Sequence, residues 1–331
     1  PTPEDSRAMS KPGQDPGTAA PIVALSGGVG AARFLSGLVR VTAPEDVVAI
    51  VNTGDDREFY GVHVAPDLDI VTYTLAGAVN TDLGYGLAGD RFELVETLGR
   101  LGHETWFRLG DRDFAHCLHR TLKLQAGAGL AEITDEMRKS LGVATRILPM
   151  SEDPCPTRVD LSDGRKIHFE DYMIREGAPD SVEAVDLSAA QAAAAGPGVL
   201  ETIASARLIL VCPSNPVVSV GPILAVPGVT DALAKSRAPV VAVSPIVGGA
   251  PVKGPASQLL RGIGVEVSAA GVAHHYRDWI DGYVLDQRDA ALETEIKGFD
   301  LATRVTDSMM VDPEAAARLA AATLELADSL T

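Results

Sequence analysis

Short apolar runs alternate along the chain with longer amphipathic stretches. Runs rich in β-branched residues, each short enough to be a buried strand, lie at 21–25, 47–51, 208–211, 239–243 and 282–285. Helical periodicity is found between or after them, at 31–39, 68–79, 93–101, 113–125 and 130–142. A last amphipathic helix begins where Asp312 can cap it and Pro313 occupies its first turn. Strands that alternate with helices predict an α/β fold built on a mainly parallel sheet.

The middle of the chain has a different pattern. Residues 157–171 alternate polar and apolar positions around Asp163 and Gly164, which predicts a β-hairpin. We therefore expect a single Rossmann-like, doubly wound α/β domain over residues 21–331, with a helical and β-hairpin insertion at roughly 80–190. Residues 1–20 are rich in Pro, Gly, Ser and charge, which predicts a disordered leader.

The overall charge limits the partners that the chain can bind. With 28 basic and 45 acidic residues the net charge is −17, which repels nucleic acid and anionic membranes, so neither is expected as a partner. Three cysteines without a CxxC pair indicate a reducing compartment. No apolar run has membrane-spanning length, and the first residues lack a signal-peptide core. These features predict a cytoplasmic protein.

Four carboxylates follow the apolar run 47–51 closely. Asp55 and Asp56 come directly after Asn52, and Asp67 and Asp69 follow soon after. Two like charges about 4 Å apart repel by roughly 4 kcal/mol at an effective dielectric near 20. Such a cluster must be solvated, share a proton or hold a cation, and its oxygen ligands suit Mg²⁺. The alternative is turn chemistry, because Asn, Gly and Asp are common in loops.

A glycine loop follows the first predicted strand. Residues 27–30 (GGVG) precede a predicted helix, and such a unit presents backbone N–H groups and a helix N-terminus to an anion. The match to a dinucleotide fingerprint is partial, because Arg33 stands at the third glycine position; a tight strand–helix turn is the alternative. Residues 212–216 and 244–249 also follow strands, so their Ser and Asn side chains can reach the same crevice.

Other polar residues leave more than one interpretation open. Arg112 stands between Asp111 and Asp113, where it either binds a phosphate or polar substrate edge or belongs to an ordinary helix N-terminus. The histidine pairs at 116 and 119 and at 274 and 275 complete no zinc pattern. The chain has no Gly-x-Ser-x-Gly, His-Glu-x-x-His or Walker motif, which argues against the common hydrolases and kinases.

Taken together, these motifs resemble those of one family, the 2-phospho-L-lactate transferases (CofD/FbiA) of coenzyme F-420 biosynthesis. The similar segments occur in order at 25–30 (LSGGVG), 51–56 (VNTGDD), 65–69 (APDLD), 109–113 (LGDRD), 213–224 (PSNP to SVGPIL) and 244–248 (SPIVG). The resemblance implies that a phospho-acid passes from a guanosine diphosphate conjugate to the ribityl hydroxyl of the deazaflavin Fo, with release of GMP. The acid is phospholactyl, phosphoenolpyruvyl or phosphoglyceryl, and the sequence does not distinguish them.

The resemblance also implies site residues. Asp55 and Asp67 become the catalytic, Mg²⁺-binding acids, although either Asp of each pair can be the ligand. Fo is expected at Asp67, Asp69 and Arg112, and the protein is expected to be a homodimer. The guanosine diphosphate part is expected at the residues of the two loops and the second strand end, namely Gly27, Gly28, Val29, Gly30, Asn52, Ser214 and Asn215.

Two other classes of protein share part of this pattern. A related family of nucleotide-sugar-binding regulators has the same Gly-Gly-x-Gly opening, but tends to carry Asp-Asp-Gly-Gly-Ser-Ser after the second strand. Here the chain continues as Asp-Asp-Arg-Glu-Phe at 55–59, which favours the transferase. The interpretation as an NAD-dependent dehydrogenase is supported only by the partial glycine fingerprint.

Overall fold

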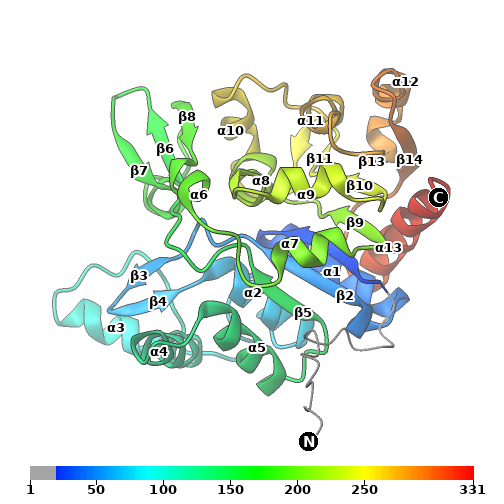
Figure 1. Cartoon of the computed structure of the whole chain (residues 1–331). Helices are drawn as coiled ribbons and strands as arrows, with labels where there is room; N and C mark the ends of the chain where they lie inside the picture. The colour runs from blue at the N-terminus through cyan, green and yellow to red at the C-terminus, as the bar shows by residue number, and fades with distance from the viewer. Residues whose placement is uncertain (1–19) are drawn as a thin grey trace, which may run out of the picture.

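The computed structural model describes residues 20–331, so the predicted leader lies outside the described residues apart from position 20. A seven-stranded sheet in the order β14-β13-β10-β9-β1-β2-β5 forms the centre of the molecule (Figure 1), and every neighbouring pair in it is parallel. Its strands are β1 (Ile22–Ser26), β2 (Val47–Val51), β5 (Arg146–Pro149), β9 (Leu208–Val211), β10 (Val240–Val243), β13 (Gly282–Asp286) and β14 (Ala302–Thr306). The predicted Rossmann-like, doubly wound fold is confirmed.

Helices cover both faces of the sheet, because the buried strands are apolar on both sides. In β1, Val23 and Leu25 point into one core cluster and Ile22 and Ala24 into the other. One face is covered by α1 (Gly28–Val41), α2 (Pro66–Leu75), α5 (Leu130–Ser140) and α13 (Pro313–Asp328). The other face is covered by α7 (Val199–Ala204), α8 (Gly221–Ala225), α9 (Val229–Lys235), α10 (Ala256–Gly262) and α11 (Ala269–Tyr276).

The strand order fixes where a ligand can bind. From β1 the chain moves outward through β2 to β5, and it then returns to β9 on the other side of β1. The loops after β1 and β9 therefore separate to opposite sides and leave a crevice at the carboxyl ends of the strands. The loop of residues 212–216 follows β9 and packs against the first turn of α1 beside this crevice.

Smaller elements surround this sheet on the side of the crevice. The expected hairpin is present as β6 (Arg158–Leu161) and β7 (Lys166–His168), and β8 (Val182–Asp186) adds a third antiparallel strand. A second antiparallel hairpin is made by β3 (Arg57–Phe59) and β4 (Val62–Val64), and a third by β11 (Ile246–Val247) and β12 (Ala250–Pro251). The remaining helices are α3 (Glu93–Arg100), α4 (Asp111–Gln125), α6 (Ser188–Ala192) and α12 (Glu293–Lys297), with helical turns η1 (Pro44–Asp46), η2 (Asp171–Arg175), η3 (Pro216–Val220) and η4 (Gln287–Leu292).

Three local predictions differ from the structure. Helix α1 begins at Gly28, inside the expected glycine loop, so those glycines form the first turn of the helix. Helix α2 ends at Leu75 rather than near residue 79. Strands β5 and β14 at the two sheet edges were not predicted, because β5 includes an Arg and a Pro and the residues of β14 are only half-buried.

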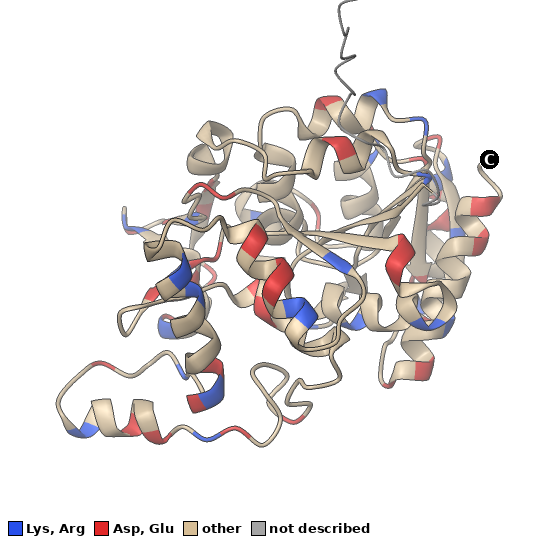
Figure 2. Ribbon diagram, turned by 60° about the horizontal axis from the view of Figure 1, so that its bottom comes forward, with Lys and Arg blue, Asp and Glu red and all other residues tan. Residues whose placement is uncertain are grey.

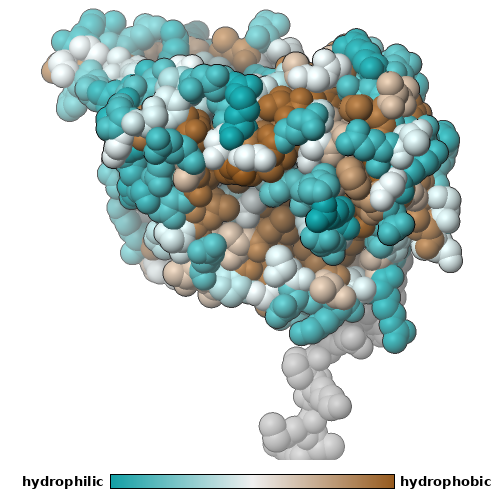
Figure 3. Space-filling view, turned by 90° about the horizontal axis from the view of Figure 1, so that it is seen from above, coloured by the Kyte–Doolittle hydropathy of each residue, from teal (hydrophilic) through white to brown (hydrophobic). Residues whose placement is uncertain are grey.

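The surface carries both signs of charge. Acidic residues are distributed over helices throughout the molecule, with Lys and Arg interspersed (Figure 2). Seen from above, hydrophilic residues frame apolar surface in a hollow near the centre (Figure 3). Among residues 20–331 no single helix is long and apolar enough to cross a membrane; one bent pair, Pro216–Ala225 with Val229–Lys235 at 83°, meets that criterion by length and composition alone.

Gly30→Ala tests the packing of α1 against the loop after β9. A Cβ at Gly30 would lie 2.2 Å from the Pro213 carbonyl oxygen, so we expect the free energy of unfolding to fall by about 1–3 kcal/mol, as for an overpacked core. Gly99→Ala in α3 is the matched control, because its Cβ would meet only the Thr105 side chain, at 3.3 Å, and Ala favours a helix by roughly 0.5–1 kcal/mol. Urea denaturation measures the free energy of unfolding of both variants. Equal changes in this free energy for the two substitutions would contradict the packing of α1 against the loop after β9.

Candidate active site

A cavity of about 610 Å³ occupies the crevice, within the size range of small-molecule sites. It is lined by residues from the ends of β1, β2, β9 and β10 and from the smaller hairpins. Of the predicted site residues, those that line it are Gly27, Gly28, Val29, Gly30, Asp55, Asp67, Asp69, Ser214 and Asn215. Asn52 and Arg112 are not in its wall.

The first turn of α1 forms one side of the cavity. Gly28 has a φ of +69°, a left-handed conformation that glycine adopts without strain, and its N–H donates to Asp67 Oδ1 at 2.8 Å. The amides of Val29 and Gly30 are also in this turn, where a helix offers them no internal acceptor. Ser214 Oγ, in the neighbouring loop after β9, is buried without a hydrogen-bond partner among the described residues. These donors suit a phosphate group.

Three buried carboxyl groups gather beside this turn. Asp55 follows β2, Asp67 lies in the first turn of α2, and Glu170 follows β7; they are 5%, 5% and 2% exposed. Asn52 is placed behind the cavity wall and donates its side-chain amide to Asp67 Oδ2 at 2.9 Å. Asp55 Oδ1 and Glu170 Oε2 have no partner in the part of the chain that the structure describes.

Burial, together with repulsion between neighbouring carboxyl groups, raises the pKa values of all three. Burial, then the neighbouring Asp67 and Glu170, raise the pKa of Asp55 well above its usual range. Burial raises the pKa of Asp67 to about 6, and burial together with Asp67 raises that of Glu170 to about 8. Unpartnered, buried carboxylate oxygens that repel one another fit a hard divalent cation such as Mg²⁺.

The structure distinguishes the two members of each acidic pair. Asp56 is bound to His63 Nε2 at 3.0 Å and is not in the cavity wall, whereas its neighbour Asp55 is. Asp69 lines the cavity but forms a buried ion pair with Arg120, whereas Asp67 accepts only neutral donors. Asp55 and Asp67 are therefore the members of the two pairs that have no positively charged partner.

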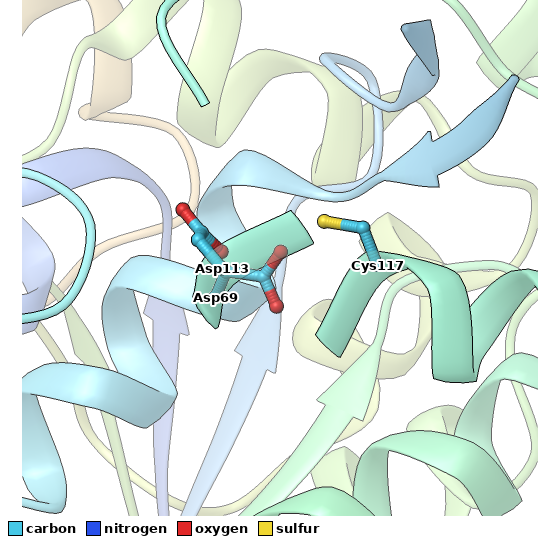
Figure 4. A group of neighbouring side chains, drawn as sticks. All are labelled: Asp69, Asp113 and Cys117. Carbon is cyan, nitrogen blue, oxygen red and sulfur yellow. The ribbon is translucent and has the colours of Figure 1, made fainter. Parts of the chain in front are cut away.

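A second acidic group lies between α2 and α4. Asp69, Asp113 and Cys117 each offer one ligand atom, and these atoms lie within 4.8 Å of one another, as their side chains converge in Figure 4. The Arg120 guanidinium already contacts Asp69, and the Tyr73 hydroxyl donates to Asp113 Oδ1 at 2.8 Å. We therefore interpret this group as a neutralised internal network, in which burial and Asp69 raise the pKa of Asp113 to about 7.

The far side of the cavity is apolar and aromatic. Trp106 and Phe107 line it, and both pack on Phe59, whose ring lies 3.8 Å from that of Phe107 in a stacked arrangement. Other apolar residues that line the cavity are Tyr85, Met173, Ile174, Met309 and Met310. Such a surface suits a planar ring system.

Arg112 lies outside the cavity wall. Its side chain is exposed and donates to the Ala88 carbonyl at 3.1 Å, and its backbone N–H donates to Asp90. The structure thus does not bring Arg112 together with Asp67 and Asp69 as the resemblance implied, because the guanidinium turns to the loop that precedes α3.

Sequence reasoning did not identify three contributors to this site. Glu170 is separated from Asp55 by more than a hundred residues and reaches it only through the β6–β7 hairpin. Arg120 lies in α4, where no local pattern distinguishes it from the exposed Arg112 of the same helix, and Trp106 lies in a segment without periodicity. The one available sign was the hairpin pattern at 157–171, which ends directly at Glu170.

Comparison with known proteins assigns the family. A model described as 2-phospho-L-lactate transferase CofD matches residues 22–325, and the chain belongs to this family. The predicted membership of a transferase family of coenzyme F-420 biosynthesis is thus confirmed, and the regulator and dehydrogenase alternatives are set aside.

Individual relatives are similar over nearly their whole length. The phosphoenolpyruvate transferase of Kitasatospora aureofaciens is 43% identical over 315 residues, which cover 93% of this chain and 98% of that protein. The 2-phospho-L-lactate transferase of Methanosarcina mazei is 37% identical over 300 residues, covering 90% and 98%. A crystal structure of a UPF0052 family member from Bacillus halodurans has a TM-score of 0.66 at 20% identity, covering 93% of this chain and 100% of that one, a likeness that shows the fold alone.

The raised carboxyl pKa values predict how stability depends on pH. Glu170 holds its proton in the folded state up to about pH 8, whereas the unfolded chain loses it near pH 4, so metal-free stability falls as the pH rises toward 8. The window from pH 6.5 to 8.5 avoids the opposing effect of buried histidines such as His168, whose pKa burial lowers to about 4. Asp113, whose pKa is about 7, acts there in the same direction as Glu170. Urea denaturation in EDTA should show the decline, and Mg²⁺ should stabilise more at pH 8 than at pH 6.5.

Glu170→Gln should flatten this pH dependence, and Glu183→Gln, on the exposed side of β8, should leave it unchanged. Stability that rises from pH 6.5 to 8.5 in EDTA, or an identical slope in wild type and Glu170→Gln, would contradict the assignment.

Proposed function

We propose that this protein transfers a phospho-acid from a guanosine diphosphate conjugate to the ribityl hydroxyl of Fo and releases GMP. The acceptor oxygen forms a bond to the phosphorus that bears the acid, the bond from that phosphorus to GMP breaks, and the hydroxyl proton is lost. The product is F-420-0 or its dehydro form. Family membership supports the class of reaction. The observation that carries the proposal is that Asp55, Asp67 and the N-terminus of α1 all line one cavity.

Each wall of the cavity has a part in this proposal. The α1 amides and Ser214 bind the diphosphate, and Asn215 supports them by capping η3 through the Val217 N–H at 2.9 Å. The aromatic wall with Trp106 and Phe107 accepts the deazaflavin ring. Phosphoryl-type transfer depends on positioning and charge neutralisation more than on a covalent nucleophile, which agrees with a site that presents carboxylates and amides.

Asp55, Asp67 and Glu170 hold the Mg²⁺ ion in this proposal. The fit rests on the buried, unpartnered oxygens of Asp55 and Glu170, and on the burial and carboxylate repulsion that raise the pKa values of both. The ion, when bound, supplies positive charge to the diphosphate. Asn52 and the Gly28 amide fix the Asp67 carboxylate, so its orientation is set before the ion arrives.

The donor acid is proposed to be phosphoenolpyruvate. The relatives at 43% and 44% identity bear the name phosphoenolpyruvate transferase, whereas the one named 2-phospho-L-lactate transferase is 37% identical. A homodimer and a cytoplasmic location remain predictions from the sequence.

Product analysis tests this function. Wild-type protein with Mg²⁺ and Fo should form dehydro-F-420-0, identified by its mass, and GMP from the phosphoenolpyruvyl donor, and less product from the phospholactyl and phosphoglyceryl donors. Asp55→Asn and Asp67→Asn should abolish product while keeping the thermal transition in metal-free buffer, because each removes a negative charge that holds the ion. Asp46→Asn, in the exposed turn η1, is the control and should be fully active. Wild-type product formation in both site variants would rule out the metal assignment, and no product with any donor would rule out the function.

Arg112→Lys tests the Fo contact that the resemblance implies. This role requires the guanidinium to leave the Ala88 carbonyl and turn toward Fo, where its planar fork binds carbonyl or ribityl oxygens in a way that Lys does not. We expect the KM for Fo to rise several-fold more than the KM for the donor, and Arg91→Lys on the exposed loop to change neither. If the KM for Fo is unchanged, Arg112 does not contact Fo and only connects the loop before α3 to α4 through its hydrogen bonds.

A further inference from the structure

Three basic side chains on the cavity wall lack an acidic partner among the described residues. Of residues 20–331, Arg33, Arg108 and Lys253 are the basic residues that line the cavity. The Arg108 guanidinium lies over the Phe92 ring, 4.4 Å from its centroid. Arg33 and Lys253 form no ion pair with any described carboxylate, although the chain carries a net charge of −17.

These two side chains are close enough to affect each other. Partial burial, and then the charge of Arg33, lower the pKa of the Lys253 ammonium. Arg33 lies one turn into α1, beyond the amides of Val29 and Gly30. Lys253 follows β12 and reaches across to the loop before α3, where a Cβ at Gly84 would lie 2.8 Å from its Nζ. Two like charges directed at one cavity repel, and an anion between them removes that repulsion.

The place of this pair within the cavity limits which anion it can bind. The diphosphate is accounted for by the α1 amides and by the buried, unpartnered Ser214 hydroxyl. Lys253 Nζ lies beside Gly84, which lines the cavity, and Arg33 lies one turn farther along α1 than the amides of Val29 and Gly30. An anion bound by this pair therefore lies next to the diphosphate on α1, and the group attached to the diphosphate is the acid that is transferred.

Phosphoenolpyruvate and 2-phospho-L-lactate both carry a carboxylate on the carbon that bears the phosphate oxygen. This carboxylate adds a negative charge near the phosphorus, where Asp55, Asp67 and Glu170 would repel it in the absence of a local cation. We propose that Lys253 and Arg33 bind the carboxylate of the phospho-acid and so select donors that carry one. The inference rests on the proposed function and adds the residues that recognise the acid.

Binding measurements separate this role from general phosphate binding. Calorimetry in the presence of Mg²⁺ would compare three probes, namely GDP, guanosine diphosphate esterified to L-lactate, and the ethyl ester of guanosine diphosphate, which lacks the carboxylate. Wild-type protein should bind the lactyl ester roughly tenfold to a hundredfold more tightly than the ethyl ester, the range expected for a hydrogen bond between charged groups. Lys253→Met should lose most of this preference while its affinity for GDP and the ethyl ester changes less than about threefold.

Variants supply the controls. Arg33→Met should lose part of the same preference, Lys253→Arg should retain it, and Lys235→Met, at the end of α9, should behave as wild type. Loss of affinity for all three probes in Lys253→Met would make this residue a diphosphate contact and overturn the inference. Equal wild-type affinity for the two esters would overturn it while leaving the proposed function intact. Wild-type protein that binds none of the probes would overturn the proposed function and this inference together.

Discussion

The repulsion among buried carboxyl groups at the switch point of the sheet is the constraint on which the rest of the site depends. Asp55, Asp67 and Glu170 come from the end of β2, the start of α2 and the end of β7, and are brought together only by the complete fold. Burial disfavours their charged forms, so the metal-free protein holds protons that a cation can replace. The core on both sides of the parallel sheet supplies the free energy that keeps them close.

Asp67 and Asp69 are close in the sequence, but only one of them has a positively charged partner. Asp69, two residues after Asp67, is neutralised by the buried Arg120, and removal of either partner would leave an unpaired charge in the interior. Asp67 accepts only the Asn52 amide and the Gly28 N–H, which orient it without cancelling its charge. The ion pair thus neutralises the charge of Asp69, whereas Asp67 remains available to a ligand.

Much of this arrangement could be predicted from the sequence, and the failures have physical causes. The strands β1, β2 and β9 were predicted because a central parallel strand is apolar on both faces. The two acidic pairs could be found because they follow a strand end and a helix-initiating proline, both local features, and the family resemblance then pointed to Asp55 and Asp67. Glu170 and Arg120 could not be identified from the sequence. Their partners are far away along the chain and are brought close only by tertiary contacts. The place of Arg112 depends on a loop conformation, and the family pattern does not specify that conformation.

Anomalous scattering from crystals grown with Mn²⁺ and GDP tests the central claim most directly, since Mn²⁺ takes the oxygen ligands that Mg²⁺ takes. The account predicts an anomalous peak bound by Asp55 and Asp67, with Glu170 at or next to it and the diphosphate on the opposite side. A peak at Asp69, Asp113 and Cys117, or none in the cavity while GDP is bound, would contradict it.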